Sequence, residues 1–174
     1  MAIRTVVNYP ARVLKGVADP VGVIGDVDRR LASDLVDTMY DAPGCVGLAA
    51  PQLGVASRAF AMDVSVMRKP PSRHHGLVVL FDPELIVAHG SELKREGCMS
   101  VPDYTCDVRR ATGVVVRGTT PEGEVRVIEA DGFEARALQH ELDHLDGLLV
   151  LDRVAGPSDV FPRKRYADKG RHLK

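Results

Sequence analysis

The sequence has no long apolar run and no excess of charge of either sign. Its longest apolar runs, such as residues 77–81, are far too short to span a bilayer, and residues 1–4 lack the apolar core of a signal peptide. Lysine and arginine total 23 against 24 aspartate and glutamate, so the net charge is −1 and gives no signature of nucleic-acid or membrane binding. These absences predict a soluble, cytoplasmic protein with no membrane partner and no specific DNA partner.

Cysteine is also scarce. The three cysteines, Cys45, Cys98 and Cys106, are an odd number in a chain without an export signal, which argues against a disulfide framework. Free thiols or metal ligands are the remaining interpretations. A length of 174 residues suits one domain, 1–174, because two halves would each be too small to bury a sizeable core. From about residue 153 the chain turns polar and basic, which predicts a frayed tail.

Hydrophobic periodicity predicts an α+β protein with several strands around a late helix. Apolar residues recur at helical spacing over residues 27–40 and 133–146, and we expect residues 44–54 to form a tight connection and the polar spacer 69–76, with His74 and His75, to be solvated. The expected strands are residues 58–64, 77–81, 84–88, 106–109, 112–118 and 125–129, with a further short strand at 148–151.

The second predicted helix carries the strongest chemical signal in the sequence. His140 and His144 are four residues apart, so both imidazoles lie on one helical face and can reach one metal ion, and Glu141 follows the first histidine directly. This HExxH arrangement is typical of metal-assisted hydrolysis. The alternative is two histidines satisfied within the core, but chance occurrence of the motif on a helix with such an apolar circumference is rare.

Two imidazoles are too few for a protein metal site, and Cys98 is the best candidate for a third ligand. Gly97 beside it allows close approach of the backbone, whereas Cys45 and Cys106 have no equally telling setting. Three protein ligands leave one tetrahedral position for water, whose pKa the metal lowers. Glu141 could then act as general base and acid, or alternatively only hydrogen-bond to a ligand, and Gln52 offers a side-chain donor for an oxyanion.

Three stretches together resemble one family, peptide deformylase. Residues 47–52 (GLAAPQ), 96–100 (EGCMS) and 140–144 (HELDH) match its three signature motifs in order and at family-like separations, and the resemblance extends to about Asp152. It implies an α+β fold in which antiparallel strands surround a central buried helix that carries the HExxH motif. It also implies hydrolysis of the N-formyl group from the initiator methionine of newly synthesised polypeptides, with release of formate.

The resemblance also implies a cofactor and its ligands. By position, Cys98, His140 and His144 bind the metal, which family members use in the cell as Fe²⁺, with Zn²⁺, Ni²⁺ or Co²⁺ as possible substitutes. Residue chemistry alone favours zinc, since two imidazoles and a thiolate suit several metals. The expectation of iron therefore rests on the resemblance.

The remaining site residues are carried over in the same way. Glu141 is the acid and base, while Gln52 and the backbone N–H of Met99 hold the formyl oxyanion. The positions implied to line the substrate cleft, where backbone groups would pair with a formyl-methionyl nascent peptide as an added strand does, are Val46, Gly47 and Gly97.

Two departures and two supporting roles complete the expectations. Cys45 stands where the family motif usually has glycine, so a positive φ there would strain the backbone, and its thiol could make the enzyme sensitive to oxidation. Met99 replaces a commoner leucine, a conservative change because the implied role belongs to the backbone. We expect Asp143 to anchor structure around the site and Arg110 to pair with Glu96 and so fix the cysteine segment.

Two other functions compete with deformylation. An HExxH endopeptidase would cleave internal peptide bonds, and a noncatalytic metal-stabilised module would have a closed site with Cys45 or Cys106 as fourth ligand. The basic tail suggests a weak contact with ribosomal RNA, because phosphate contacts need only clustered lysine and arginine.

Overall fold

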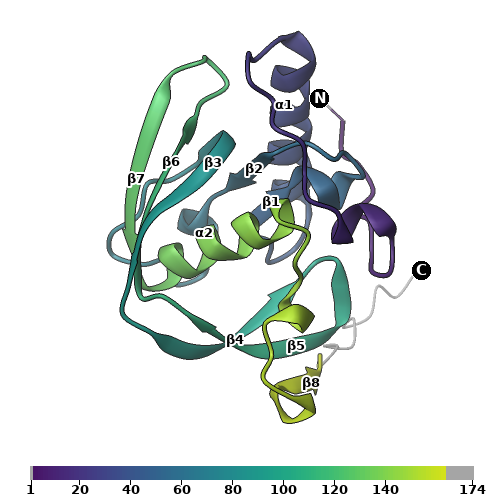
Figure 1. Cartoon of the computed structure of the whole chain (residues 1–174), viewed down its shortest axis with the longest axis vertical. Coiled ribbons are helices and arrows are strands. Elements are labelled where there is room, and N and C mark those ends of the chain that lie inside the picture. The colour runs from purple at the N-terminus through teal and green to yellow at the C-terminus, as the bar shows by residue number, and fades with distance from the viewer. Residues whose placement is uncertain (1, 164–174) are drawn as a thin grey trace, which may run out of the picture.

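The computed structural model describes residues 2–163, which form two α-helices and two antiparallel sheets (Figure 1). The helices are α1 (Asp26–Asp41) and α2 (Gly132–Leu145). The strands are β1 (Gly47–Ala49), β2 (Ala59–Met62), β3 (Val78–His89), β4 (Glu92–Cys98), β5 (Val101–Arg110), β6 (Gly113–Thr119), β7 (Val125–Asp131) and β8 (Val160–Pro162). The predicted α+β class, with antiparallel strands, is confirmed.

The chain passes between the two sheets three times, twice through short connections and once through α2, which leads from β7 toward β8. One sheet has the order β1-β2-β3-β6-β7 and the other the order β4-β5-β8. β3 ends at His89 and β4 begins at Glu92, and the chain returns between Arg110 and Gly113. Short connections of this kind keep the two sheets close to each other, and Figure 1 shows α2 lying between them.

Helix α2 forms almost where periodicity predicted a helix. Gly132 precedes Phe133 with a φ of 53°, a value that favours glycine, and Gly147, with a φ of 71°, follows the last turn. The apolar side of α2 packs on the five-stranded sheet, and each large apolar side chain buried there contributes about 1.5–3 kcal/mol relative to exposure. The core residues of this layer include Phe60, Met62, Leu80, Val116, Ile128, Leu138, Leu142 and Leu145.

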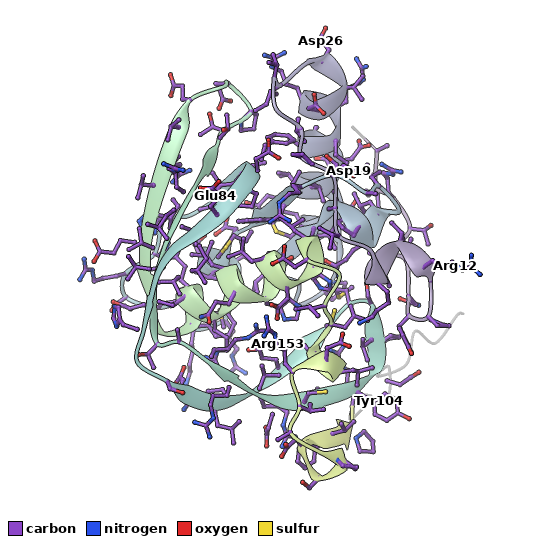
Figure 2. All side chains as sticks on the ribbon, viewed as in Figure 1. Arg12, Asp19, Asp26, Glu84, Tyr104 and Arg153 are labelled. Atoms are coloured by element: carbon purple, nitrogen blue, oxygen red, sulfur yellow. The ribbon has the colours of Figure 1, made fainter. Side chains whose placement is uncertain are left out.

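Helix α1 covers the other end of the five-stranded sheet. Its apolar stripe, Leu31, Leu35 and Met39, packs with Leu48 and Phe81 in a second core cluster. The Gly25 N–H donates to Asp28 Oδ2 over 2.8 Å, so the first turn is capped. Figure 2 shows Asp26 at the outer end of this helix, in the polar surroundings that an amphipathic helix requires.

Three local predictions were wrong. Residues 77–81 and 84–88 belong to one long strand, β3, whose register shifts between Phe81 and Glu84, where Asp82 has a φ of 46°. Residues 148–151 do not form a strand: a 3₁₀ helix runs from Val150 to Asp152, because the Asp152 carboxylate accepts the Leu149 N–H at 2.7 Å. The connection at 44–54 contains β1 and a 3₁₀ helix, Ala50–Leu53.

The predicted frayed tail is partly ordered. Strand β8 pairs with β5 through Tyr104, Thr105 and Cys106, so the polar composition after residue 153 does not prevent strand pairing there. Figure 2 shows Tyr104 beside this part of the chain. Residues 164–174, which carry most of the predicted basic tail, lie outside the described residues.

One histidine of the polar spacer has a partner that periodicity could not indicate. His75 Nδ1 lies 3.0 Å from Oε2 of the buried Glu134, and the His75 N–H donates to the same carboxylate. The spacer is thereby attached to α2, which corrects the expectation of two solvated histidines. Within residues 2–163, neither helix combines the length and the apolar character that a bilayer crossing would need.

Candidate metal centre

The structure brings the three predicted ligands together from two elements. Cys98 ends β4, while His140 and His144 lie one turn apart on α2, and the three donor atoms all lie within 4.8 Å of one another. Cys98 Sγ is 3.3 Å from His144 Nε2. Donors bound at about 2.0–2.3 Å around one tetrahedral ion are separated by roughly 3.3–3.8 Å, so the thiol and this imidazole already have suitable spacing.

The orientation of His140 is set by a carboxylate behind it. Nδ1 of His140 lies 3.1 Å from Glu96 Oε2, and a carboxylate accepts, so this nitrogen carries the proton and Nε2 is left for a ligand. Glu96 is 7% exposed, yet its hydrogen bonds to His140 and Arg110 hold its pKa below the usual range against the opposing effect of burial. Glu96 therefore stays ionised and keeps the ring in this tautomer.

Arg110 joins this carboxylate to helix α2. Its Nε and Nη2 each donate to Glu96 over 3.0 Å, and its Nη1 donates to Asp143 Oδ2 over 2.5 Å. Arg153 also bonds the Asp143 carboxylate. Both hypotheses about supporting residues are confirmed: Arg110 fixes the cysteine strand through Glu96, and Asp143 anchors β5 and the segment after α2.

Glu141 points into the space beside the ligands. It is 3% exposed and its Oε2 is buried with no hydrogen-bond partner among residues 2–163. Burial raises the pKa of Glu141 to about 7, with the positive charges of His140 and Arg110 opposing that rise. A side chain on Gly47 would collide with the Glu141 carboxylate, so glycine in β1 is what leaves room for it.

Gln52 is held in one amide orientation. The Ala49 N–H donates to Gln52 Oε1 over 2.9 Å, so the NH₂ group faces the other way, 3.2 Å from Ser100 Oγ and 3.8 Å from Cys98 Sγ. Gln52 is 1% exposed. Met99 follows Cys98 in the two-residue turn between β4 and β5, which places its backbone N–H next to the same sulfur.

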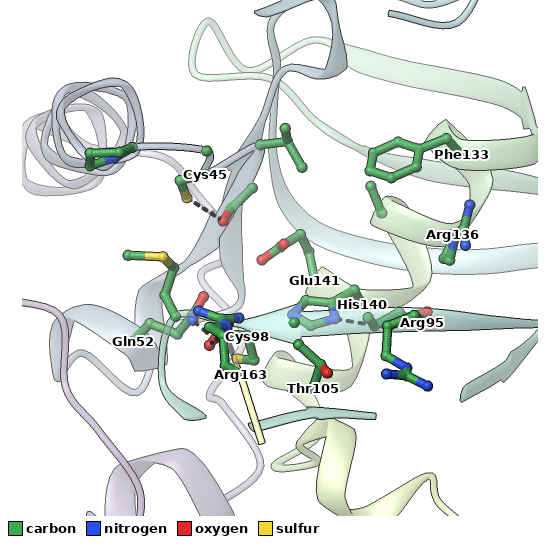
Figure 3. A pocket seen from close by; sticks show the side chains of 18 residues that line it. Cys45, Gln52, Arg95, Cys98, Thr105, Phe133, Arg136, His140, Glu141 and Arg163 are labelled. Carbon is green, nitrogen blue, oxygen red and sulfur yellow. Dashed lines mark hydrogen bonds and ion pairs between the residues drawn. The ribbon is translucent and has the colours of Figure 1, made fainter. Parts of the chain in front are cut away.

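These groups surround a cavity of about 390 Å³ (Figure 3). The predicted cleft residues Val46, Gly47 and Gly97 all line it, as do Gln52, Met99 and Glu141. Gly47 and Gly97 lie on edge strands, since β1 ends one sheet and β4 ends the other. The outer edge of each pairs with no other strand among residues 2–163.

Cys45 also lines the cavity but without the expected strain. Among residues 2–163, Asp82 is the one residue other than glycine with a positive φ, so Cys45 adopts ordinary backbone geometry and Gly44, at 74°, makes the turn. The Cys45 thiol donates to the Gly47 carbonyl over 3.1 Å. Burial, and then the negative charge of Glu141, raise its pKa to about 11. This thiol is protonated at neutral pH, which argues against the expected sensitivity to oxidation.

The cavity has further lining residues that sequence reasoning missed. They are Pro43, Gly44, Arg95, Thr105, Phe133, Arg136, Ala137 and Arg163. Figure 3 shows Phe133 and Arg136 beyond His140, on the side away from Gln52. Phe133, Ala137 and His140 share a helical face, a signal that was available, whereas nothing near Arg163 in sequence indicates a site.

Comparison with known proteins agrees with this geometry. The sequence pattern of the family described as polypeptide deformylase matches residues 3–159. The chain belongs to the polypeptide deformylase family. Members of this family remove the N-formyl group from the initiator methionine of nascent polypeptides. The match includes both helices and every strand of the two sheets except β8, which begins at Val160.

Individual relatives extend over nearly the whole length. The peptide deformylase of Thermodesulfovibrio yellowstonii is 40% identical over 169 residues, which are 97% of this chain and 99% of that protein. Peptide deformylase 1 of Bacillus subtilis is 40% identical over 89% of this chain and 92% of its own. A crystal structure of a Legionella pneumophila peptide deformylase superposes with a TM-score of 0.81 at 38% identity, covering 90% of this chain and 88% of that one.

Proposed function

We propose that this deformylase hydrolyses the formyl amide of formyl-methionyl peptides at a metal held by Cys98, His140 and His144. The observation that carries this is the unpartnered Glu141 carboxylate, buried beside three clustered donors in the cavity. One thiolate and two imidazoles fit a divalent transition metal, and a single cluster of this kind is found among residues 2–163. When bound, such an ion supplies Lewis acidity that activates water and polarises a carbonyl.

Glu141 has the position for proton transfer, because its Oε2 is buried beside the three donors without a hydrogen-bond partner among residues 2–163. It can take a proton as the water oxygen attacks the formyl carbon, and give it to the amine nitrogen as the carbon–nitrogen bond breaks. Formate and a peptide with a free amino group are the products.

Gln52 and Met99 supply donors for the oxygen of the formyl group. The amide of Gln52 is fixed by Ala49 and Ser100, so its N–H groups need no reorientation as negative charge develops on that oxygen. The Met99 N–H adds a backbone donor at the turn beyond Cys98. Donors held in advance are worth about 2.7–4 kcal/mol each in comparable oxyanion sites.

The edge strands β1 and β4 suit an extended peptide. Gly47 and Gly97 line the cavity on these two strands, where backbone groups can pair with a peptide as an added strand. A solved Acinetobacter baumannii peptide deformylase, 32% identical with a TM-score of 0.81, was crystallised with Met-Ala-Ser bound. The match covers 88% of this chain, and it supports the proposal that this chain also binds a peptide.

The test measures formate and metal together. Protein prepared without oxygen should release formate from formyl-Met-Ala-Ser, and Glu141→Gln should lower kcat by at least about a hundredfold while the metal content stays that of the unsubstituted protein. Cys98→Ser should lose metal as well as activity. Release of formate by Glu141→Gln at the unsubstituted rate would contradict the role of Glu141.

The remaining proposals rest on the resemblance. They are iron as the native ion, a cytoplasmic location and a weak ribosome contact through the basic tail, and all three suit an enzyme that acts on nascent chains. No observation favours the endopeptidase, and Cys45 and Cys106 both lie outside the three-residue ligand cluster described within residues 2–163, which speaks against a closed structural site. Cleavage of internal peptide bonds in casein without formate release would favour the endopeptidase over the deformylase.

A further inference from the structure

The charged groups around the cavity are not equally available to a substrate. Glu96 is committed to Arg110 and His140, and Glu141 is reserved for proton transfer. Arg95 is paired with Asp107, over 2.6 and 3.2 Å. This leaves Arg136, which has Glu92 as a partner, and Arg163 as the other cavity-lining cations.

Arg163 is the freer of the two. Arg136 has Glu92 at 3.9 Å and the Phe133 ring at 5.1 Å, and its side chain is 14% exposed. Among residues 2–163, Arg163 makes one side-chain hydrogen bond, from Nη2 to the Cys98 carbonyl over 3.4 Å, and pairs with no carboxylate. A guanidinium has five N–H donors, so most of those on Arg163 have no partner in the described part of the chain.

Strand geometry explains how Arg163 reaches the cavity. Gly97, Thr105 and Phe161 lie opposite one another on β4, β5 and β8, and side chains two residues apart on a strand share a face. The Arg95 guanidinium lies 3.4 Å from the centre of the Phe161 ring. Arg163 directly follows the last residue of β8, where its N–H donates to the Asp103 carbonyl over 2.8 Å, and its guanidinium lies against Gly97. It occupies the space that a side chain on Gly97 would fill.

The position of Arg163 relates directly to the path of the peptide. In the proposed function the formyl group lies beside Cys98 and Gln52, and the peptide continues from there along the edge of β4. One extended residue spans about 3.3 Å, so a guanidinium in contact with Gly97 and the Cys98 carbonyl is within reach of the side chains of the next two residues. A carboxylate there could form a two-bond pair with the fork of N–H groups.

We propose that Arg163 makes this enzyme select formyl-methionyl peptides with an acidic side chain at the second or third residue. This specificity rests on the proposed deformylation. An ion pair between Arg163 and a substrate carboxylate at the solvent-accessible cavity contributes up to about 1 kcal/mol to binding, which corresponds to about fivefold in kcat/KM. The preference should weaken as salt is raised from about 50 to 500 mM, since salt screens exposed charges.

The experiment compares kcat/KM for formyl-Met-Asp-Ala, formyl-Met-Ala-Ala and formyl-Met-Lys-Ala, and for the set with the variable residue in third position. The unsubstituted enzyme should favour aspartate over lysine by about fivefold at one position at least. Arg163→Gln should bring the aspartate-to-lysine ratio of kcat/KM to about one. Arg163→Lys should still favour aspartate, and Arg163→Glu should favour lysine. The ratio is taken within each variant, so a general loss of activity does not affect it.

A matched control is available on β6. Arg117 pairs with Glu84 over 2.7 Å, away from the cavity, so Arg117→Gln should keep the aspartate-to-lysine ratio of the unsubstituted enzyme. A ratio near one in the unsubstituted enzyme, or an unchanged ratio in Arg163→Gln, would overturn the specificity while leaving deformylation in place. Absence of formate from all the peptides would overturn the proposed function and this inference with it.

Discussion

At the scale of single residues, Arg110 is the charge on which most other buried charges depend. It is 5% exposed and neutralises two buried carboxylates, Glu96 and Asp143. Arg110→Met should lower the free energy of unfolding by about 3–5 kcal/mol, because it leaves those carboxylates with much less compensation. Urea denaturation followed by circular dichroism measures this.

The exposed pair of Arg117 and Glu84 provides the contrast. Their side chains are 54% and 63% exposed, so Arg117→Met should cost less than about 1 kcal/mol. Equal losses in free energy of unfolding for Arg110→Met and Arg117→Met would show that burial does not determine how much Arg110 contributes to stability.

Cys45 yields a prediction about pH. Its pKa of about 11 means that the folded state holds the protonated thiol, so reaction with iodoacetamide should be slow at pH 7–8 and should accelerate only as pH rises toward 11. The raised pKa also favours folding below the thiol's ordinary pKa of about 8.5, and this contribution is lost as pH rises through the folded value. Peptide mapping by mass spectrometry follows Cys45 separately from Cys98.

Unfolded protein in urea serves as the reference for that measurement. There Cys45 should react as an ordinary thiol with a pKa of about 8.5. Equal alkylation rates in the folded and unfolded protein at pH 8 would contradict the protected, protonated thiol.

Residue chemistry predicted some of these contacts and could not predict others. The pairing of Arg110 with Glu96 followed from an acid beside a candidate ligand and a base on a nearby strand. Arg163 was assigned to a solvated tail, because its contact with Gly97 depends on pairing between Thr105 and Phe161, which are 56 positions apart, and no local pattern encodes that pairing.

At the scale of elements, strand β1 controls the space available to the catalytic carboxylate. Gly47→Ala would place a methyl group on the Glu141 side chain, so kcat should fall by at least about tenfold through displacement of Glu141. The melting temperature should change little if the carboxylate moves toward the cavity. Measuring formate release and the calorimetric melting temperature on one preparation separates the effect on kcat from the effect on stability.

Gly16→Ala is the matched glycine control. Nothing lies within 4 Å of the added methyl group, and the backbone there is extended, with a φ of −97°. Its kcat should equal that of the unsubstituted protein. Full activity in Gly47→Ala would show that Glu141 tolerates the methyl group in place.

The irregular point of β3 is a second feature of this scale. Asp82 adopts a φ of 46° and its carboxylate accepts the N–H groups of Val21 and Gly22, each over 2.8 Å. Asp82→Ala should lower the free energy of unfolding by about 2 kcal/mol, through backbone strain and two lost acceptors. Asp82→Gly loses the same two acceptors but relieves the backbone strain, so it should lower the free energy of unfolding by less than Asp82→Ala. Equal losses for the two variants in urea denaturation would assign the whole effect to the lost acceptors.

Sequence patterns predicted the two helices well because each has its own apolar stripe of period 3.6. They failed for β3 because Asp82 and Pro83 have the composition of a turn, whereas hydrogen bonds from Val21 and Gly22, about 60 residues earlier, hold this segment within a strand. They also missed β4, whose exposed residues alternate with buried ones only near Glu96 and Cys98.

At the scale of the whole molecule, the proposed metal would connect the three-stranded sheet to α2. Cys98 lies on β4 and the two histidines on the helix, so a bound ion stabilises the folded state by its binding free energy. Removing the ion with a chelator should lower the melting temperature by at least several degrees, and restoring Zn²⁺ or Fe²⁺ should recover it. Cys98→Ser should show no such dependence, and an unchanged melting temperature on chelation of the unsubstituted protein would contradict the metal site.

The chain of paired basic and acidic side chains behind the metal ligands has a consequence for how this protein can change over generations. It runs from His140 through Glu96, Arg110 and Asp143 to the more exposed Arg153, with basic and acidic groups in alternation. Replacing Glu96, Arg110 or Asp143 alone leaves a neighbour with uncompensated charge, so single replacements there are penalised while joint replacements that keep the sum of charge need not be. We expect substitutions at these five positions to occur together among related proteins, because the five side chains together fix the orientation of the His140 imidazole.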